Sequence, residues 1–311
     1  MAAEFAVVRT RWQVFRRRFR RDRAAVVGAC LLGLVVVLTL LAPLVVRYGN
    51  HHPPNALYTR QALDPEFGTP NGPNGSFWLG ADPSGRDLAT RVLYGTRTSL
   101  LVSLVATAVS VALGTLTGLV AGYFRGPVDT LLSRAMDVLL AFPVILLALG
   151  LAASCGGGAG CAGGLIRPGT SLVILVIALA NWPYLGRLVR GQVLSLRAKE
   201  FVEAAHMIGA GSVWVMRSEI LPNLLAPVIV YATVALPTNV LFEAALSFLG
   251  IGVHPPDPSL GQMIADSTAT FTTAWWYFVF PGLVLLATVL ACNLVGDGLR
   301  DSLLPHQSRM R

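Results

Sequence analysis

Lysine is almost absent from this 311-residue chain, since Lys199 is the single one. A phosphate-binding Walker loop requires Gly-Lys followed by Ser or Thr, whereas Lys199 stands between Ala198 and Glu200. This excludes a standard ATP site. We therefore expect the chain to bind no cofactor, and ATP-driven work would require a separate partner that binds ATP and magnesium.

Cysteine and histidine are also scarce, with 4 and 5 residues. Their scattered positions do not predict a metal site, and no catalytic set of side chains emerges, so we do not expect an enzyme. Cys30 and Cys292 fall in apolar segments, whereas Cys155 and Cys161 bracket a Gly-rich stretch. The short connection between the latter two permits a disulfide, with two free thiols as the alternative.

Charged residues make up only 13% of the chain, against 54% hydrophobic residues and a mean hydropathy of +0.63. Such a composition excludes an ordinary soluble domain and predicts a polytopic, all-α membrane protein. A membrane span needs about 20 mostly apolar residues. Six segments meet this requirement: residues 24–46, 98–120, 131–153, 171–189, 224–242 and 275–295.

Basic residues concentrate before the first apolar segment, where eight arginines precede residue 24. The positive-inside rule places this end in the cytoplasm, and six spans return the C-terminal tail, residues 301–311, to the same side. Residues 47–97 then form an extracytoplasmic segment. Their richness in Pro, Asn and Gly predicts an exposed loop that either contacts another protein or serves as a spacer.

The arginines of residues 1–23 alternate with Val8, Trp12, Phe15 and Phe19, at spacings of four, three and four. This predicts an amphipathic helix at the membrane interface, with its arginines among anionic headgroups. The net charge of +8 is thereby explained without nucleic acid. The first apolar run is too long for the core of a cleaved signal peptide.

The segment 190–223 is a polar stretch between two apolar spans. Gly209 suits the left-handed end of a helix, Ser212 is a good N-cap, and Pro222 follows a second short helix. We therefore expect a helix-turn-helix outside the bilayer, which either docks another protein or lies on the membrane or on its own chain. The first helix is predicted by residues that share one face at helical spacing: Leu194, Phe201, Ala204, Ala205 and Ile208.

The most distinctive motifs of the chain are Glu203-Ala204-Ala205 with Gly209, Ile220 to Asn223, Leu79 to Asp87, Tyr94 to Leu100, Asp137 to Pro143, Leu246 to Val253 and Asn293 to Asp301. Together they resemble the second (C-type) permease subunit of dipeptide and oligopeptide ABC importers, a family that also includes nickel and glutathione systems. The likeness covers nearly the whole chain.

This resemblance implies an ABC permease core over residues 98–300 and a prokaryotic cytoplasmic membrane location. It also implies a heterodimer with a related permease, two ABC ATPase subunits on the cytoplasmic side and an extracytoplasmic solute-binding protein. The coupling helix that docks the ATPases would contain Glu203, Ala204, Ala205, His206, Gly209 and Ala210. The expected substrate is a di- or oligopeptide, with nickel or glutathione as alternatives.

Polar residues inside predicted spans are candidates for the translocation pathway. Glu243, at the outer end of the fifth span, could meet a peptide ammonium group or serve an interfacial or partner contact. Asn181 lies near Pro183 in the fourth span, where it could face the pathway or make an ordinary hydrogen bond between helices. For Asp137 we expect an ion pair with Arg134 one turn earlier.

Six spans and scattered acids also suit an ion-coupled secondary transporter, and a membrane scaffold or receptor is a third possibility. The docking segment distinguishes them. A carrier would move its substrate without ATPase subunits, a scaffold would bind partners without flux, and a permease would fail when the turn at Gly209 is damaged.

Overall fold

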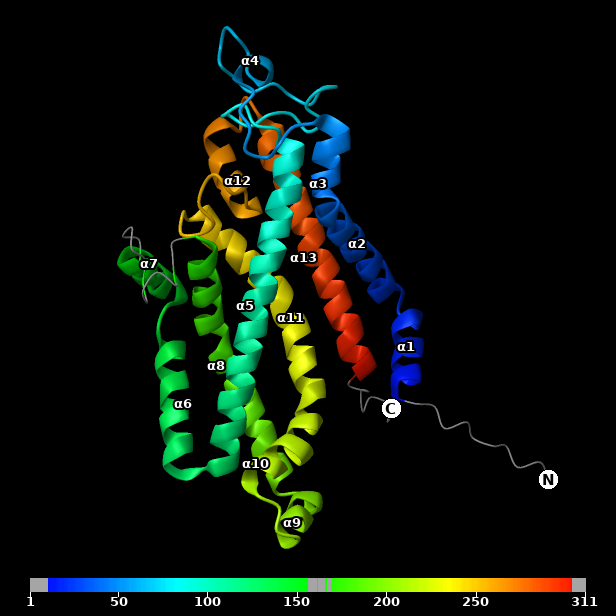
Figure 1. Cartoon of the computed structure of the whole chain (residues 1–311), viewed down its shortest axis with the longest axis vertical. Coiled ribbons are helices and arrows are strands. Elements are labelled where there is room, and N and C mark those ends of the chain that lie inside the picture. Colours follow the sequence, from blue (N-terminus) through cyan, green and yellow to red (C-terminus); the bar gives the residue numbers. More distant parts are fainter. Residues whose placement is uncertain (1–10, 156–160, 162–165, 167–168, 304–311) are drawn as a thin grey trace, which may run out of the picture.

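The computed structural model describes residues 11–155, 161, 166 and 169–303, and the predictions for residues 1–10 and 304–311 lie outside this part. The described chain is an elongated bundle of helices (Figure 1). Residues 51–87, which we call the cap, cover one end together with α12, and α9 projects at the opposite end. The long helices run between these two ends.

The first half of the chain contains α1 (Arg11–Arg21), α2 (Arg23–Leu40), α3 (Ala42–Leu44), a π-helical turn (Val45–Asn50), α4 (Thr59–Ala62), α5 (Leu88–Phe124), α6 (Gly126–Ala141) and α7 (Val144–Cys155). The second half contains α8 (Thr170–Arg197), α9 (Glu200–Met207), α10 (Ser212–Trp214), a π-helical turn (Val215–Ile220), α11 (Leu221–Phe248), α12 (Leu260–Ser267), a 3₁₀ turn (Thr268–Thr270) and α13 (Trp275–Leu303). In the described residues, five helical segments are long and apolar enough to cross a membrane, or six if α6 and α7 count as one.

The third predicted span, residues 131–153, is not one straight helix. It divides into α6 and α7, whose axes differ by 91°. The break falls at Phe142, which has an extended ψ of 128°, just before Pro143. Proline disfavours the helical conformation of the residue before it and cannot donate a backbone hydrogen bond, so the helix ends there.

The second span begins ten residues earlier than predicted, at Leu88 instead of Thr98. Asp87 provides the N-cap, because its Oδ1 accepts a hydrogen bond from the Thr90 backbone N–H at 2.9 Å. The polar residues of this first turn, Thr90 and Arg91, are fully buried beneath the cap. A hydropathy window misses this extension because it averages the buried polar residues with the apolar ones.

The central pair of helices is α5 and α8, which lie side by side over most of their length (Figure 1). Gly114, Gly118 and Gly122 recur every four residues on α5 and face α8. A Cβ atom at Gly118 would lie 2.5 Å from the carbonyl oxygen of Gly186. The backbones therefore approach as closely as glycine permits, as is typical of tightly packed membrane helices.

Helix α1 lies beside the C-terminal end of α13, with the Phe19 ring against Gly298. Asp22 then starts α2 by accepting a hydrogen bond from the Ala24 backbone N–H at 2.9 Å. Four arginines of α1 surround one surface recess: Arg16, Arg17, Arg20 and Arg21. The placement of these arginines among anionic headgroups remains a prediction.

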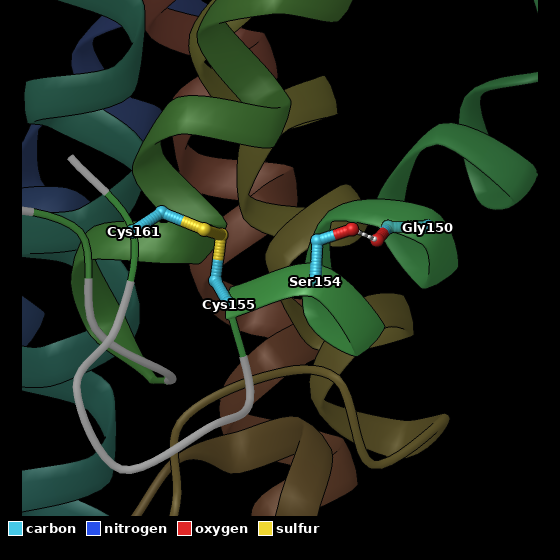
Figure 2. The surroundings of a disulfide bond; sticks show 4 residues. All are labelled: Gly150, Ser154, Cys155 and Cys161. Carbon is cyan, nitrogen blue, oxygen red and sulfur yellow. Dashed lines mark hydrogen bonds between the residues drawn. A yellow bond between two sulfur atoms is a disulfide. The ribbon is translucent and has the colours of Figure 1, made fainter.

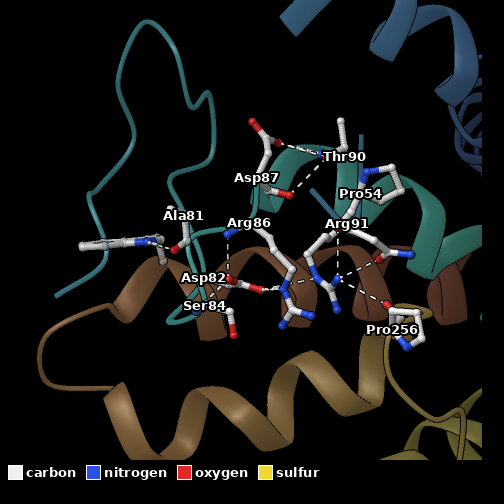
Figure 3. A network of polar contacts seen from close by, with 11 residues as sticks. Pro54, Ala81, Asp82, Ser84, Arg86, Asp87, Thr90, Arg91 and Pro256 are labelled. Atoms are coloured by element: carbon white, nitrogen blue, oxygen red, sulfur yellow. Dashed lines mark hydrogen bonds and ion pairs between the residues drawn. The ribbon is translucent and has the colours of Figure 1, made fainter. Parts of the chain in front are cut away.

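The cap is held on the bundle by a buried charge network (Figure 3). Asp82 is fully buried and pairs with Arg86 at 2.6 Å and with Arg91 of α5 at 3.5 Å. The Trp276 indole N–H donates to the Ala81 carbonyl at 3.2 Å. Buried charges need partners of this kind, so the cap is folded and joined to α5 by buried contacts, which the prediction of an exposed loop over residues 47–97 did not include.

Candidate docking helix and membrane cavity

The candidate docking helix is α9, which projects farthest from the bundle at the end opposite the cap (Figure 1). The single helix predicted from Leu194 to Ile208 is wrong, because the chain leaves helical geometry between α8 and α9. Lys199, with φ −90° and ψ 146°, is extended and forms the N-cap of α9. Glu200 and Glu203 occupy the first turn of α9, where negative charge is favoured by the helix dipole.

The end of α9 has the geometry predicted for it at Gly209, whose φ is +83°. The Ala210 N–H donates to the Ala205 carbonyl and the Gly209 N–H to the His206 carbonyl, at 3.0 and 2.9 Å. This hydrogen-bond pair is a Schellman motif. The helix that follows is not separate, since α10, the π-helical turn and α11 form a continuous helical run through Pro222. Pro222 lies where the π-helical turn gives way to α11 and does not end the run.

The surface of α9 differs from the predicted docking set in two respects. Ala205 and Val202 are buried, so they fix α9 to the bundle instead of meeting a partner. Glu203, Ala204, His206 and Gly209 are exposed and Ala210 is half-buried. Missing from the prediction is Met207, which is 88% exposed at the tip next to Ile208 at 81%. No sequence signal marks Met207, because its exposure depends on which side of α9 packs against the bundle.

A cavity of about 430 Å³ lies between α8 and α11, and it is lined by Val144, Ala180, Asn181, Tyr184, Thr238, Asn239, Leu241, Phe242 and Ala245. A second hollow of about 220 Å³ shares three of these residues and adds Tyr231, Val234 and Ala235. Neither lining contains a charged side chain or a histidine. The polar groups that face this space are neutral amides and hydroxyls.

Asn181 is the centre of a hydrogen-bond chain that joins three helices. Its Nδ2 donates to Oδ1 of Asn239 at 3.0 Å, and Nδ2 of Asn239 donates to Oγ1 of Thr107 on α5 at 2.7 Å. The Tyr231 hydroxyl lies 3.4 Å from the Asn181 carbonyl, to which it donates. The hydrogen bond between helices that was one expectation for Asn181 is therefore present. Asn181 also lines the cavity, and its role in a translocation pathway stays a prediction.

Glu243 does not join Asn181 in this cavity. Its side chain is fully buried near the cap end of α11, where Oε1 accepts a hydrogen bond from the Ser247 hydroxyl at 2.8 Å. Because no part of the carboxyl group reaches a surface, a substrate ammonium has no access to it in this conformation. The structure favours an internal packing role for Glu243.

Two ion pairs connect α6 to α8 in the half of the bundle nearer α9. Asp129 accepts hydrogen bonds from the Arg190 guanidinium at 2.5 and 2.7 Å. Asp137 pairs with Arg187, while its predicted partner Arg134 lies farther away, at 4.0 Å. These charges are therefore used between helices, and the within-helix pair is the weaker of the two.

Cys155 and Cys161 are joined by a disulfide, which is the first of the two states considered for them (Figure 2). Cys155 is almost fully buried at the end of α7, against residues of α5 and α8. The bond joins the end of α7 to a residue six positions later in the chain, ahead of α8. In the part of the chain that the structure describes, no group of three or more His, Cys, Asp or Glu residues is arranged to hold a metal ion.

Comparison with known proteins decides the class of this chain. Residues 114–309 match the family of the binding-protein-dependent transport system inner membrane component. Residues 10–64 match the N-terminal TM domain of oligopeptide transport permease C. The chain belongs to the binding-protein-dependent transport permeases. It is a membrane-embedded permease subunit of an ABC importer, of the C type found in peptide systems.

Full-length relatives agree with this assignment. The permease is 38% identical over 296 residues to the dipeptide transport system permease protein DppC of Alkalihalophilus pseudofirmus, covering 94% of this chain and 90% of the relative. It is 40% identical over 290 residues to a putative peptide transport system permease of Brucella abortus, covering 93% and 90%. It is 38% identical over 298 residues to the glutathione transport system permease protein GsiD of Escherichia coli, covering 96% and 91%.

Solved structures show the same fold. A chain of the MetNI methionine ABC transporter in an inward-facing conformation matches with a TM-score of 0.56 at 17% identity, over 70% of this permease and 98% of that chain. The family assignment excludes the ion-coupled carrier and the non-transporting scaffold. Transport, and not catalysis, is the work of this family.

Proposed function

We propose that this permease carries di- or oligopeptides through half of a pathway that it shares with a second, homologous permease. The observation that carries this proposal is the neutral lining of the cavity between α8 and α11, where Asn181, Tyr184 and Asn239 offer amide and hydroxyl groups. Peptide backbones carry the same types of donor and acceptor. The named relatives transport dipeptide and glutathione, which share amide bonds.

A nickel substrate fits this cavity poorly. Nickel prefers imidazole, thiolate or carboxylate ligands, whereas the side chains lining the cavity are apolar, aromatic, amide or hydroxyl. Glutathione is a charged peptide and remains the second candidate, because one relative carries it.

Helix α9 is the proposed docking site for one of two ATPase subunits, and the second would dock on the companion permease. Its exposed residues include Glu203, Ala204, His206 and Gly209, and the tip at Met207 adds an apolar contact. The ATPases would bind ATP and magnesium, and their closure would move α9. The single lysine, Lys199, leaves this chain without a Walker loop of its own.

In the proposed orientation α9 and both termini face the cytoplasm of a prokaryotic cell, and the cap faces outward, where a solute-binding protein delivers the substrate. The arginine excess at the α1 end supports this choice, because basic residues favour the cytoplasmic side. The disulfide at Cys155 lies near the cap end of α8, on the side where oxidising conditions prevail.

Reconstitution tests the proposed function. The permease, its companion permease, the ATPases and the binding protein are placed in liposomes, and uptake of a labelled dipeptide is compared with that of a pentapeptide, glutathione and nickel. We expect peptide uptake that requires ATP and the binding protein. Uptake of nickel alone would contradict the peptide assignment, and uptake that persists without the ATPases would contradict the coupling scheme.

A further inference from the structure

The joint between α8 and α9 interrupts the helical connection between the docking helix and the membrane spans. Helix α8 ends at Arg197 and α9 begins at Glu200, with extended Lys199 between them. Because the helical hydrogen bonds are interrupted at this point, α9 can change its angle to α8 without breaking either helix. A push on α9 would then be absorbed at the joint unless something else holds α9 in place.

Tyr123, in the last turn of α5, contacts the chain on both sides of this joint. The Arg197 guanidinium lies over its ring, 5.4 Å from the centroid, and Nη1 of Arg197 donates to the Tyr123 carbonyl at 2.5 Å. On the other side, the Tyr123 hydroxyl lies 3.3 Å from Nε2 of His206, within hydrogen-bonding distance. One side chain therefore bridges the end of α8 and the last turn of α9.

The residues around Tyr123 hold its side chain in place. It is only 5% exposed and packs in an apolar cluster with Val202 and Ala205 of α9 and with Val193 of α8. Immediately before it, Gly122 lets the α5 backbone meet α8, since a Cβ atom there would lie 2.7 Å from Cβ of Val193. The ends of α5 and α8 are thus one packed unit, and Tyr123 is the part of that unit that reaches α9.

We infer that Tyr123 is a positioning residue for transport. Its hydroxyl fastens the far end of α9, so that movement of the docking helix is passed to the α5–α8 pair instead of being lost as rotation at Lys199. The apolar contacts of Val202 and Ala205 hold α9 near the bundle, whereas the contact with His206 fixes its angle. This inference rests on the proposed function of α9 as the ATPase-docking helix.

Tyr123→Phe tests the inference, because it keeps the ring, its packing and the Arg197 contact and removes the hydroxyl that faces His206. In the reconstituted complex we expect the ATPases to assemble and to hydrolyse ATP, with peptide uptake per ATP lowered about two- to tenfold, in line with the loss of one hydrogen bond. Tyr94→Phe, the same change toward the other end of α5, is the matched control and should leave this ratio unchanged.

A double-mutant cycle with His206→Ala identifies the partner. If the contact transmits movement, Tyr123→Phe has no further effect on the uptake-to-ATP ratio once His206 is truncated. Additive effects of the two changes would overturn the inference, as would an unchanged ratio in Tyr123→Phe alone. A lowered melting temperature or loss of assembled ATPase in Tyr123→Phe would also overturn it, since that would show a purely structural role.

These outcomes are separate from failure of the proposed function. If wild-type complexes take up peptide without the ATPases, α9 is not a docking helix and the proposed function falls. If wild-type uptake requires the ATPases and Tyr123→Phe behaves as wild type, only the role of Tyr123 is wrong.

Discussion

Gly209 holds the docking turn in a backbone conformation that other L-residues adopt only with strain. Its φ of +83° allows the chain to reverse after α9 and to satisfy the last carbonyls of the helix. Two positions later, Gly211 has φ −70° and needs no such freedom. Both glycines have open space where a Cβ atom would stand, so backbone conformation alone separates them.

Alanine substitutions at Gly209 and Gly211 can be compared directly, because neither added Cβ atom would clash with a neighbour. Gly209→Ala should strain the turn by about 1–2 kcal/mol and tilt α9 away from its docking position, whereas Gly211→Ala should be neutral. We expect ATP-dependent uptake to fall severalfold in Gly209→Ala, with normal membrane insertion. Equal uptake by the two variants would remove the turn from the coupling mechanism.

At the scale of single residues, the sequence predicts backbone conformation better than the direction in which a side chain points. The left-handed turn at Gly209 follows from the residue itself, because few others tolerate φ above zero. Ala205 and Glu243 were predicted to face a partner or a substrate and are buried instead, since their direction depends on which helices pack against them. The Met207 tip was missed for the same reason.

The close approach of α5 and α8 is the main feature of the bundle at the scale of elements. The three glycines at Gly114, Gly118 and Gly122 form a groove on α5 into which α8 fits. In a membrane, association relies on such packing, because lipid tails are as apolar as the side chains. This contact between α5 and α8, the α5–α8 seam, ends at Gly122, directly before Tyr123.

Gly118→Ala should therefore destabilise the permease. The added Cβ atom would lie 2.5 Å from the Gly186 carbonyl oxygen and 2.8 Å from Cβ of Val189, and relieving that overlap costs about 1–3 kcal/mol. Gly191→Ala on the exposed side of α8 meets nothing within 4 Å and is the matched control. We expect a lower melting temperature in detergent for the first variant only. If both melt alike, the helices are not in close contact along this seam.

Hydropathy located the spans well and their ends poorly. The centres of five of the six predicted segments fall in helices, because membrane solvation demands an apolar run, and the centre of the third falls at the break between α6 and α7. The extension of α5 to Leu88 depends on burial beneath the cap, and the continuity of α10 with α11 on a π-helical turn, neither of which hydropathy measures. The sequence shows the proline at residue 143, but it does not give the 91° angle between α6 and α7.

At the scale of the whole molecule, the cap and α9 are at opposite ends, with the cavity between α8 and α11 between them (Figure 1). A signal from the ATPases would enter through α9 and reach the cavity along the α5–α8 pair. Helix α8 supplies Asn181 and Tyr184 to the cavity lining, and Thr107 of α5 accepts a hydrogen bond from Asn239. Composition and motifs predicted the transporter class, but the cavity depends on residues far apart in the chain.

Tyr184 offers the most direct test of the cavity as a substrate path. It lines both hollows and is 57% exposed, so Tyr184→Ala removes a peptide contact while leaving the packed core intact. We expect the peptide concentration for half-maximal uptake to rise severalfold, with an unchanged melting temperature. Leu40→Ala, which truncates a 64% exposed side chain on α2, is the control and should change neither quantity. If Tyr184→Ala leaves the concentration dependence as it was, peptides cross by another route and the polar chain around Asn181 serves only to join α5, α8 and α11.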